Sequence, residues 1–66
     1  MTKQYSLKAL RVDKGLTQQD VADLLDVSKT TVVQWEKDGP EPPKNLVVFA
    51  LAYLYEASVD EIRIPG

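Results

Sequence analysis

The sequence contains neither cysteine nor histidine. These absences exclude disulfides, thiolate nucleophiles, imidazole bases and ordinary zinc sites. No glycine-rich phosphate loop and no suitably paired carboxylates remain to build an active site. We therefore expect a protein that is not an enzyme and that needs neither a cofactor nor a metal.

Long hydrophobic segments are also missing. The longest apolar run, from Leu46 to Tyr55, has ten residues, whereas a helix needs about 20 to span a bilayer. The N-terminal residues Met1 to Tyr5 have neither the apolar stretch nor the cleavage site of a secretory signal. The sequence thus predicts a soluble, cytoplasmic protein without a membrane partner.

Positive charge is in slight deficit, with 8 basic residues against 10 acidic ones and a net charge of −2. Taken alone, this balance argues against nucleic acid, but the distribution of charge matters more than its sum. Residues 1–15 include four basic residues and one acid, whereas the charged residues among 16–27 are all acidic. The charge pattern permits one face to meet phosphate, without indicating that it does so.

The chain of 66 residues has room for a single domain, residues 1–66, with one modest core. Helix-capping residues divide it into short helices. The first three helices begin after favoured N-caps, which are Ser6, Thr17 and Ser28. Asp20 completes a capping box in the second helix, and Gly15 supplies the residue that ends the first one.

Prolines between residues 40 and 43 predict a rigid loop after the third helix. The run at residues 46–49 could be a buried strand, because β-branched residues favour strands. Its length and the alanines and leucine at residues 50–52 favour a fourth helix over about residues 44–56. Ser58 and Glu61 form a capping box that opens a short fifth helix, so the expected fold class is all-α.

The second and third helices are separated by a turn of three residues, and residues 17–37 therefore predict a helix-turn-helix. With about 100° per residue, Val32 and Trp35 fall on one apolar side of the third helix. The opposite arc contains no acid. It holds Lys29, Thr30, Val33, Gln34 and Lys37.

An acid-free arc of this kind suits the major groove of DNA. Gln34 can bond to both N6 and N7 of adenine, and Lys29 can donate to guanine. The methyl groups of Thr30 and Val33 can meet a thymine methyl. Taken singly, each of these residues is more often an ordinary solvent-exposed side chain than a base contact. The arc as a whole, joined to the turn, favours base reading.

The pattern LTQQDVAxLLxVSxxTVxxWE, from Leu16 to Glu36, resembles the helix-turn-helix of the Cro and phage-repressor family, also called XRE-like. Residues 51–52 and 58–62 resemble the end of the same domain, so the similarity covers about residues 5–63. The resemblance implies a compact five-helix, lambda-repressor-like domain that binds double-stranded DNA and regulates transcription. It implies base contacts by Lys29, Thr30 and Gln34.

The resemblance also implies contacts to the DNA backbone from the start of the second helix. The expected phosphate-binding residues are Thr17, Gln18, Thr31, Lys37 and Lys44. It further implies an ion pair between Arg11 and Glu36 that fixes geometry more than it stabilises. The alternative, which we regard as less favoured, leaves Arg11 free to bind phosphate.

Two positions depart from the family pattern. Asp26 stands in the turn where the family usually has glycine, and it should tolerate a left-handed conformation with mild strain. The loop after Glu36 reads KDGPE, with two acids where the family has phosphate contacts. We therefore expect weak binding to non-specific DNA.

The fourth helix is apolar on every side, which a domain of this size cannot bury entirely. We expect a homodimer that reads a palindrome, with Phe49, Tyr53 and Tyr55 as candidates for its interface. The open alternative is that this helix is simply the central helix of the core.

The length leaves no room for an effector-binding or cleavage domain, so we expect a Cro-like repressor without a small-molecule effector. The rival hypothesis is a protein-interaction module on the same fold, an antirepressor or an antitoxin-like protein. The acidic loop and the net charge favour that rival, and the acid-free arc of the third helix disfavours it.

Overall fold

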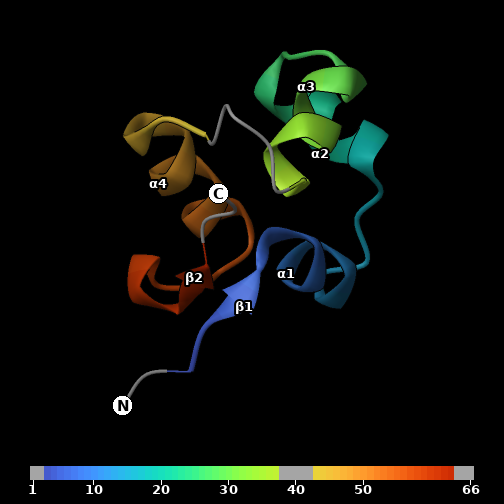
Figure 1. The fold of residues 1–66 in the computed structure, drawn as a ribbon. Helices are drawn as coiled ribbons and strands as arrows, with labels where there is room; N and C mark the ends of the chain where they lie inside the picture. Colours follow the sequence, from blue (N-terminus) through green and yellow to red (C-terminus); the bar gives the residue numbers. More distant parts are fainter. Residues whose placement is uncertain (1–2, 38–42, 64–66) are drawn as a thin grey trace.

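The computed structural model describes residues 3–37 and 43–63. In chain order the elements are β1 (Tyr5–Ser6), α1 (Leu7–Asp13), α2 (Gln18–Leu25), α3 (Lys29–Glu36), α4 (Asn45–Leu54), the 3-10 helix η1 (Val59–Glu61) and β2 (Ile62–Arg63). Helices α2 and α3 pack together at one end of the molecule (Figure 1). Helix α4 lies on the other side, and β1 and β2 pair near the chain ends (Figure 1).

The predicted starts of the first three helices are confirmed by their capping bonds. Ser6 Oγ accepts the amide of Ala9 at 3.1 Å, and Ser28 Oγ accepts the amide of Thr31 at 3.2 Å. Thr17 opens α2 with the predicted capping box. Gly15 follows α1 with a φ of +71°, as expected for a residue that ends a helix.

The prediction of five helices in an all-α fold is only partly right. The described residues form four α-helices, and the predicted fifth is a single 3-10 turn. Its start is held as expected, because Glu61 Oε1 accepts the Ser58 amide at 2.9 Å. Ile62 then turns to an extended conformation, with φ −96° and ψ 123°, and its side chain enters the core. Burial of Ile62 accounts for the early end of this helix.

The strands that follow were not predicted, because two residues are too few to show an alternating pattern. They pair in parallel, with Tyr5 opposite Ile62 and Ser6 opposite Arg63. This pairing joins the two ends of the described chain beside α1 (Figure 1). An ion pair between Lys14 and Glu56 adds a second link between the first helix and the segment after α4.

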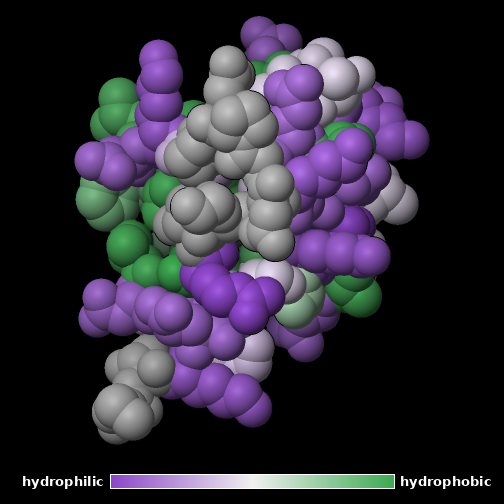
Figure 2. Space-filling view, viewed as in Figure 1, coloured by the Kyte–Doolittle hydropathy of each residue, from purple (hydrophilic) through white to green (hydrophobic). Residues whose placement is uncertain are grey.

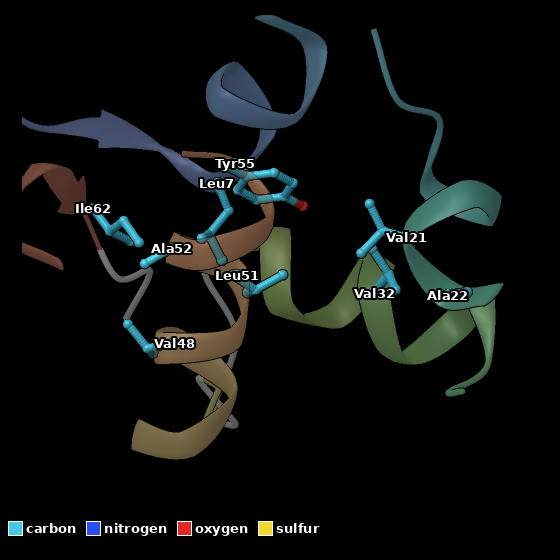
Figure 3. Close-up of a cluster of buried hydrophobic side chains, with 9 residues drawn as sticks. All are labelled: Leu7, Val21, Ala22, Val32, Val48, Leu51, Ala52, Tyr55 and Ile62. Atoms are coloured by element: carbon cyan, nitrogen blue, oxygen red, sulfur yellow. The ribbon is translucent and has the colours of Figure 1, made fainter. Parts of the chain in front are cut away.

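The core lies between α4 and the packed pair α2 and α3 (Figure 3). Leu51 and Tyr55 face Leu7 near its centre, and Val21 and Val32 approach from the opposite side (Figure 3). The buried apolar residues are Leu7, Val21, Ala22, Val32, Val48, Leu51, Ala52, Tyr55 and Ile62.

Two apolar residues of the helix-turn-helix are not fully buried. Leu24 is 60% exposed, because it lies about 200° around the helix from the buried Ala22. Trp35 is only partly buried, although it packs against the core as expected.

Helix α4 contributes to the core on one side, as the second alternative proposes, and it also carries exposed apolar residues on its other side. Val48, Leu51 and Ala52 face inward, and Leu46, Phe49 and Tyr53 face outward.

No helix in residues 3–37 or 43–63 is long and apolar enough to cross a bilayer.

The expectation that Tyr55 belongs to a dimer interface is wrong. Its side chain is 3% exposed, because the residue follows the last turn of α4 and its ring lies over Leu7 and Leu51 in the core (Figure 3). Burial raises the pKa of Tyr55 to about 12. A residue enclosed in this way offers no surface to a partner.

Candidate nucleic-acid interface

The turn between α2 and α3 has the geometry that a helix-turn-helix requires. Asp26 adopts the left-handed conformation, with φ 57° and ψ 46°, at the position where the family usually has glycine. The amide of Val27 donates to the carbonyl of Ala22 at 2.9 Å, and Ser28 caps the next helix. The turn is therefore formed despite the aspartate, as expected.

The start of α2 is held by the predicted capping box. Thr17 Oγ1 accepts the amide of Asp20 at 3.0 Å, and the Asp20 carboxylate accepts the amide of Thr17 at 2.9 Å. The hydrogen bond from the Thr17 amide lowers the pKa of the Asp20 carboxyl below its ordinary value. The hydroxyl oxygen of Thr17 is therefore already an acceptor within the protein, and the Thr17 amide is already a donor.

The outer side of α3 presents the residues expected to read bases. Lys29, Thr30 and Gln34 are exposed, and Val33 is partly exposed. In the described part of the chain none of these four side chains makes a hydrogen bond or ion pair. Within residues 3–37 and 43–63, therefore, the donors and methyl groups of this arc are not engaged by other side chains.

The residues expected to bind phosphate differ in their exposure and in their hydrogen bonds. Lys37 and Lys44 are exposed, at the end of α3 and at the start of α4. Thr31 is partly buried, and its Oγ1 lies 2.8 Å from Ser28 Oγ, so its hydroxyl belongs to the cap of α3. Gln18 is also only partly exposed and donates to another side chain.

The ion pair between Arg11 and Glu36 is present in the structure. Arg11 Nε donates to Glu36 Oε2 at 2.7 Å, and Nη2 donates to Oε1 at 3.2 Å. The two side chains are 9% and 7% exposed, and the hydrogen bond to Glu36 raises the pKa of Arg11. Glu36 is therefore shielded from a ligand at the face of α3 by its own counter-ion.

Two further hydrogen bonds around this pair were missed at the sequence level. Gln18 Nε2 donates to Glu36 Oε1 at 3.1 Å, and Arg11 Nη1 donates to the carbonyl of Leu16 at 2.8 Å. One bond connects Arg11 on α1 to Leu16, the residue before the N-cap of α2. The other connects Gln18 at the start of α2 to Glu36 at the end of α3. No spacing rule could have found them, because residues 18 and 36 are brought together only by the crossing of α2 and α3.

The described residues contain no group of three acidic, histidine or cysteine side chains that could hold a metal ion. The candidate site is an exposed surface with charged and hydrogen-bonding side chains. It consists of the start of α2 and the outer arc of α3.

A family model described as helix-turn-helix matches residues 7–62. Searches among curated proteins and among solved structures give no significant match. The matched segment contains α1, the complete α2-turn-α3 unit, α4 and the buried Ile62, so the family assignment and the geometry agree. The chain therefore belongs to the helix-turn-helix family of the Cro and phage-repressor type, a family of DNA-binding regulators of transcription.

Proposed function

We propose that this regulator is a Cro-like repressor that binds a palindromic operator as a homodimer. The observation that carries the proposal is the outer arc of α3, where Lys29, Thr30 and Gln34 are exposed and hold no partner among the described residues. The helix that carries them is fixed at its start by Ser28 and at its end by Glu36. A rigid helix with free donors on one face is suited to the major groove.

Base reading follows from the chemistry of these side chains. Gln34 binds N6 and N7 of adenine, Lys29 donates to O6 or N7 of guanine, and Thr30 and Val33 contact thymine methyl groups. The proposed contacts place Lys29 and Thr30 in the first turn of α3, the part of a recognition helix that enters the groove.

Backbone contacts set the position of the domain on the duplex. We assign them to the start of α2, at Thr17 and Gln18, and to the exposed ammonium groups of Lys37 and Lys44. The Thr17 contact would come from the proton of its hydroxyl, because the hydroxyl oxygen only accepts the amide of Asp20, whereas the Thr17 amide already donates to Asp20. We give Thr31 a minor part, because it is partly buried and its hydroxyl pairs with that of Ser28.

The dimer is assigned to the outer face of α4. Leu46, Phe49 and Tyr53 are 82%, 57% and 89% exposed and repeat at helical spacing. Hydrophobic residues gather on this side of the molecule, at the left of the view in Figure 2. A hollow of about 180 Å³ adjoins the face. It is lined by Leu25, Val27, Trp35, Leu46, Val47 and Ala50.

Two copies joined by this face present two α3 helices to one duplex, and a symmetric site then doubles the number of contacts. A single domain that reads a half-site through three or four side chains gains affinity from this arrangement. No small-molecule effector is part of the proposal.

The test is selection of bound sequences from a random duplex library, with a Thr30→Ala, Gln34→Ala double variant run in parallel. We expect a two-fold symmetric motif for the wild type that fades in the variant. Enrichment of an asymmetric motif would contradict the dimer, and equal enrichment by both proteins would contradict base reading by α3.

A second candidate function is a protein-interaction module, such as an antirepressor or an antitoxin-like protein. It is favoured by the exposed apolar face of α4 and by the net charge of −2. The dependence of duplex binding on salt separates the two functions. Affinity that falls steeply with salt supports the repressor, and the absence of binding at low salt supports the module.

A further inference from the structure

We propose that Glu36 is a positioning residue for DNA binding, which holds the carboxamide of Gln18 in the orientation that donates to a backbone phosphate. This inference rests on the proposed function, in which the start of α2 meets the DNA backbone. Glu36, an acid at the end of α3, then contributes to the binding of a phosphate anion without contacting it.

The first observation is the way in which Glu36 divides its oxygens. Oε2 is taken by Arg11 Nε at 2.7 Å, whereas Oε1 accepts both Arg11 Nη2 at 3.2 Å and Gln18 Nε2 at 3.1 Å. Arg11 balances the charge, and the side chain of Glu36 is 7% exposed. The carboxylate therefore acts inside the protein as an acceptor.

The second observation is the position of Gln18 at the first residue of α2, directly after the N-cap Thr17. A carboxamide has two N–H groups and one carbonyl oxygen, and either end can face a neighbour. A carboxylate accepts only, so Glu36 selects the nitrogen end of Gln18. One N–H is then used within the protein, and the other is left without a partner among the described residues.

An ordered donor binds phosphate more tightly than a freely rotating one, because the loss of side-chain entropy has already occurred. Removal of Glu36 would let the Gln18 carboxamide turn and flip, so that its oxygen faces the phosphate in part of the population. The contribution of Gln18 to affinity should therefore depend on Glu36.

The experiment measures how much Gln18→Ala weakens binding in two backgrounds. One is the wild type, and the other is Arg11→Met, Glu36→Met, which removes both charges and leaves the net charge unchanged. Replacement of a buried ion pair by apolar residues of similar size is often neutral for stability. The probe is a fluorescein-labelled duplex that carries the strongest sequence from the library selection, and the readout is fluorescence anisotropy.

We expect Gln18→Ala to raise Kd about tenfold in the wild type and less than about twofold in the double-methionine background. Equal losses in both backgrounds, or no loss in the wild type, would overturn the inference and leave the proposed function intact. Failure of the wild type itself to bind any duplex would instead overturn the proposed function.

Gln34→Ala is the matched control. Its side chain lies on α3, as Glu36 does, but does not contact the ion pair. The methionine substitutions would contradict the inference if they displaced the whole of α3. In that case the loss of DNA affinity caused by Gln34→Ala would be smaller in the methionine background, as the loss caused by Gln18→Ala is. If Glu36 acts through Gln18 alone, the Gln34 loss is the same in both backgrounds.

A measurement on the free wild-type protein keeps the inference testable if the methionine variant does not fold. The side-chain amide signals of Gln18 should be shifted from those of an exposed glutamine and exchange slowly with solvent in an NMR spectrum. Gln34, which is exposed, supplies the reference within the same molecule. Identical signals for the two carboxamides would show that Gln18 is not held.

Discussion

Asp26 holds the turn of the helix-turn-helix in a backbone conformation that most side chains resist. Its φ of 57° places it in the left-handed region, where glycine is favoured and aspartate is tolerated. We expect Asp26→Gly to be neutral or to raise the free energy of unfolding by up to about 1 kcal/mol, and Asp26→Ala to lower it by about 1 kcal/mol. Urea denaturation of the two variants checks this. An alanine variant as stable as the wild type would show that the turn is unstrained.

Asp20 makes the stability of α2 depend on acid. The amide of Thr17 lowers the pKa of the Asp20 carboxyl in the folded state. A lowered pKa means that the ionised form favours folding. The contribution is therefore complete above the unfolded pKa of about 3.9 and is lost as the pH falls through the lower folded value.

We accordingly expect Asp20→Asn to be less stable than the wild type at pH 7, with a difference that shrinks as the pH falls from about 5 to about 2. Thermal unfolding across this range measures the effect. Asp13→Asn is the control, because this exposed carboxylate makes no hydrogen bond within the described residues. A difference for Asp20→Asn that stays constant with pH would contradict the role of its charge.

Gln34 is expected to contribute to specificity more than to overall affinity. Gln34→Ala should weaken binding to the selected operator by roughly 1–3 kcal/mol and relax the preference at one base pair. Repetition of the selection with the variant reveals which base pair is affected. Equal losses on selected and random duplexes would show that Gln34 reads no base.

At the scale of the elements, α4 divides its surface between the core and an exposed apolar face. We expect replacement of Phe49 and Tyr53 by serine to shift the protein toward monomer in sedimentation equilibrium without unfolding it, since both side chains are largely outside the core. Val12→Ser is the control, because Val12 is also 57% exposed but lies on α1. An unchanged mass for the α4 variant would move the interface elsewhere.

The helices could be predicted from the sequence because their limits depend on local chemistry. Ser6, Thr17 and Ser28 form their caps within three residues, and Gly15 ends α1 through its own conformation. The exposed arc of α3 follows from helical periodicity for the same reason.

Features that depend on contacts between distant residues could not be predicted in this way. Tyr55 is a candidate for the dimer interface by its position in the sequence, yet the fold buries it in the core beside Leu7 and Leu51. The contact between Gln18 and Glu36 depends on the crossing of two helices. The Arg11–Glu36 pair was predicted only through the family resemblance, since neither charge alone points to the other.

At the scale of the whole molecule, Ile62 closes the core from the C-terminal side. Its side chain is 4% exposed, and its backbone pairs with Tyr5. Ile62→Ala should lower the free energy of unfolding by about 2–5 kcal/mol, a large share of the stability of a small domain. Chemical denaturation measures the loss, and Arg63→Ala, at the exposed neighbouring position, should have little effect. Equal stability of the two variants would show that the buried side chain of Ile62 adds little to the core.

The parallel direction of β1 and β2 has a mechanical consequence. When the two ends of the chain are pulled apart, the parallel strands slide past each other along their length, and the bonds between them resist the load together. An antiparallel pair joined by a hairpin would instead open one bond at a time. Because α2 and α3 lie between β1 and β2 in the sequence, a pulling force reaches the DNA-binding helices only after the two strands have separated.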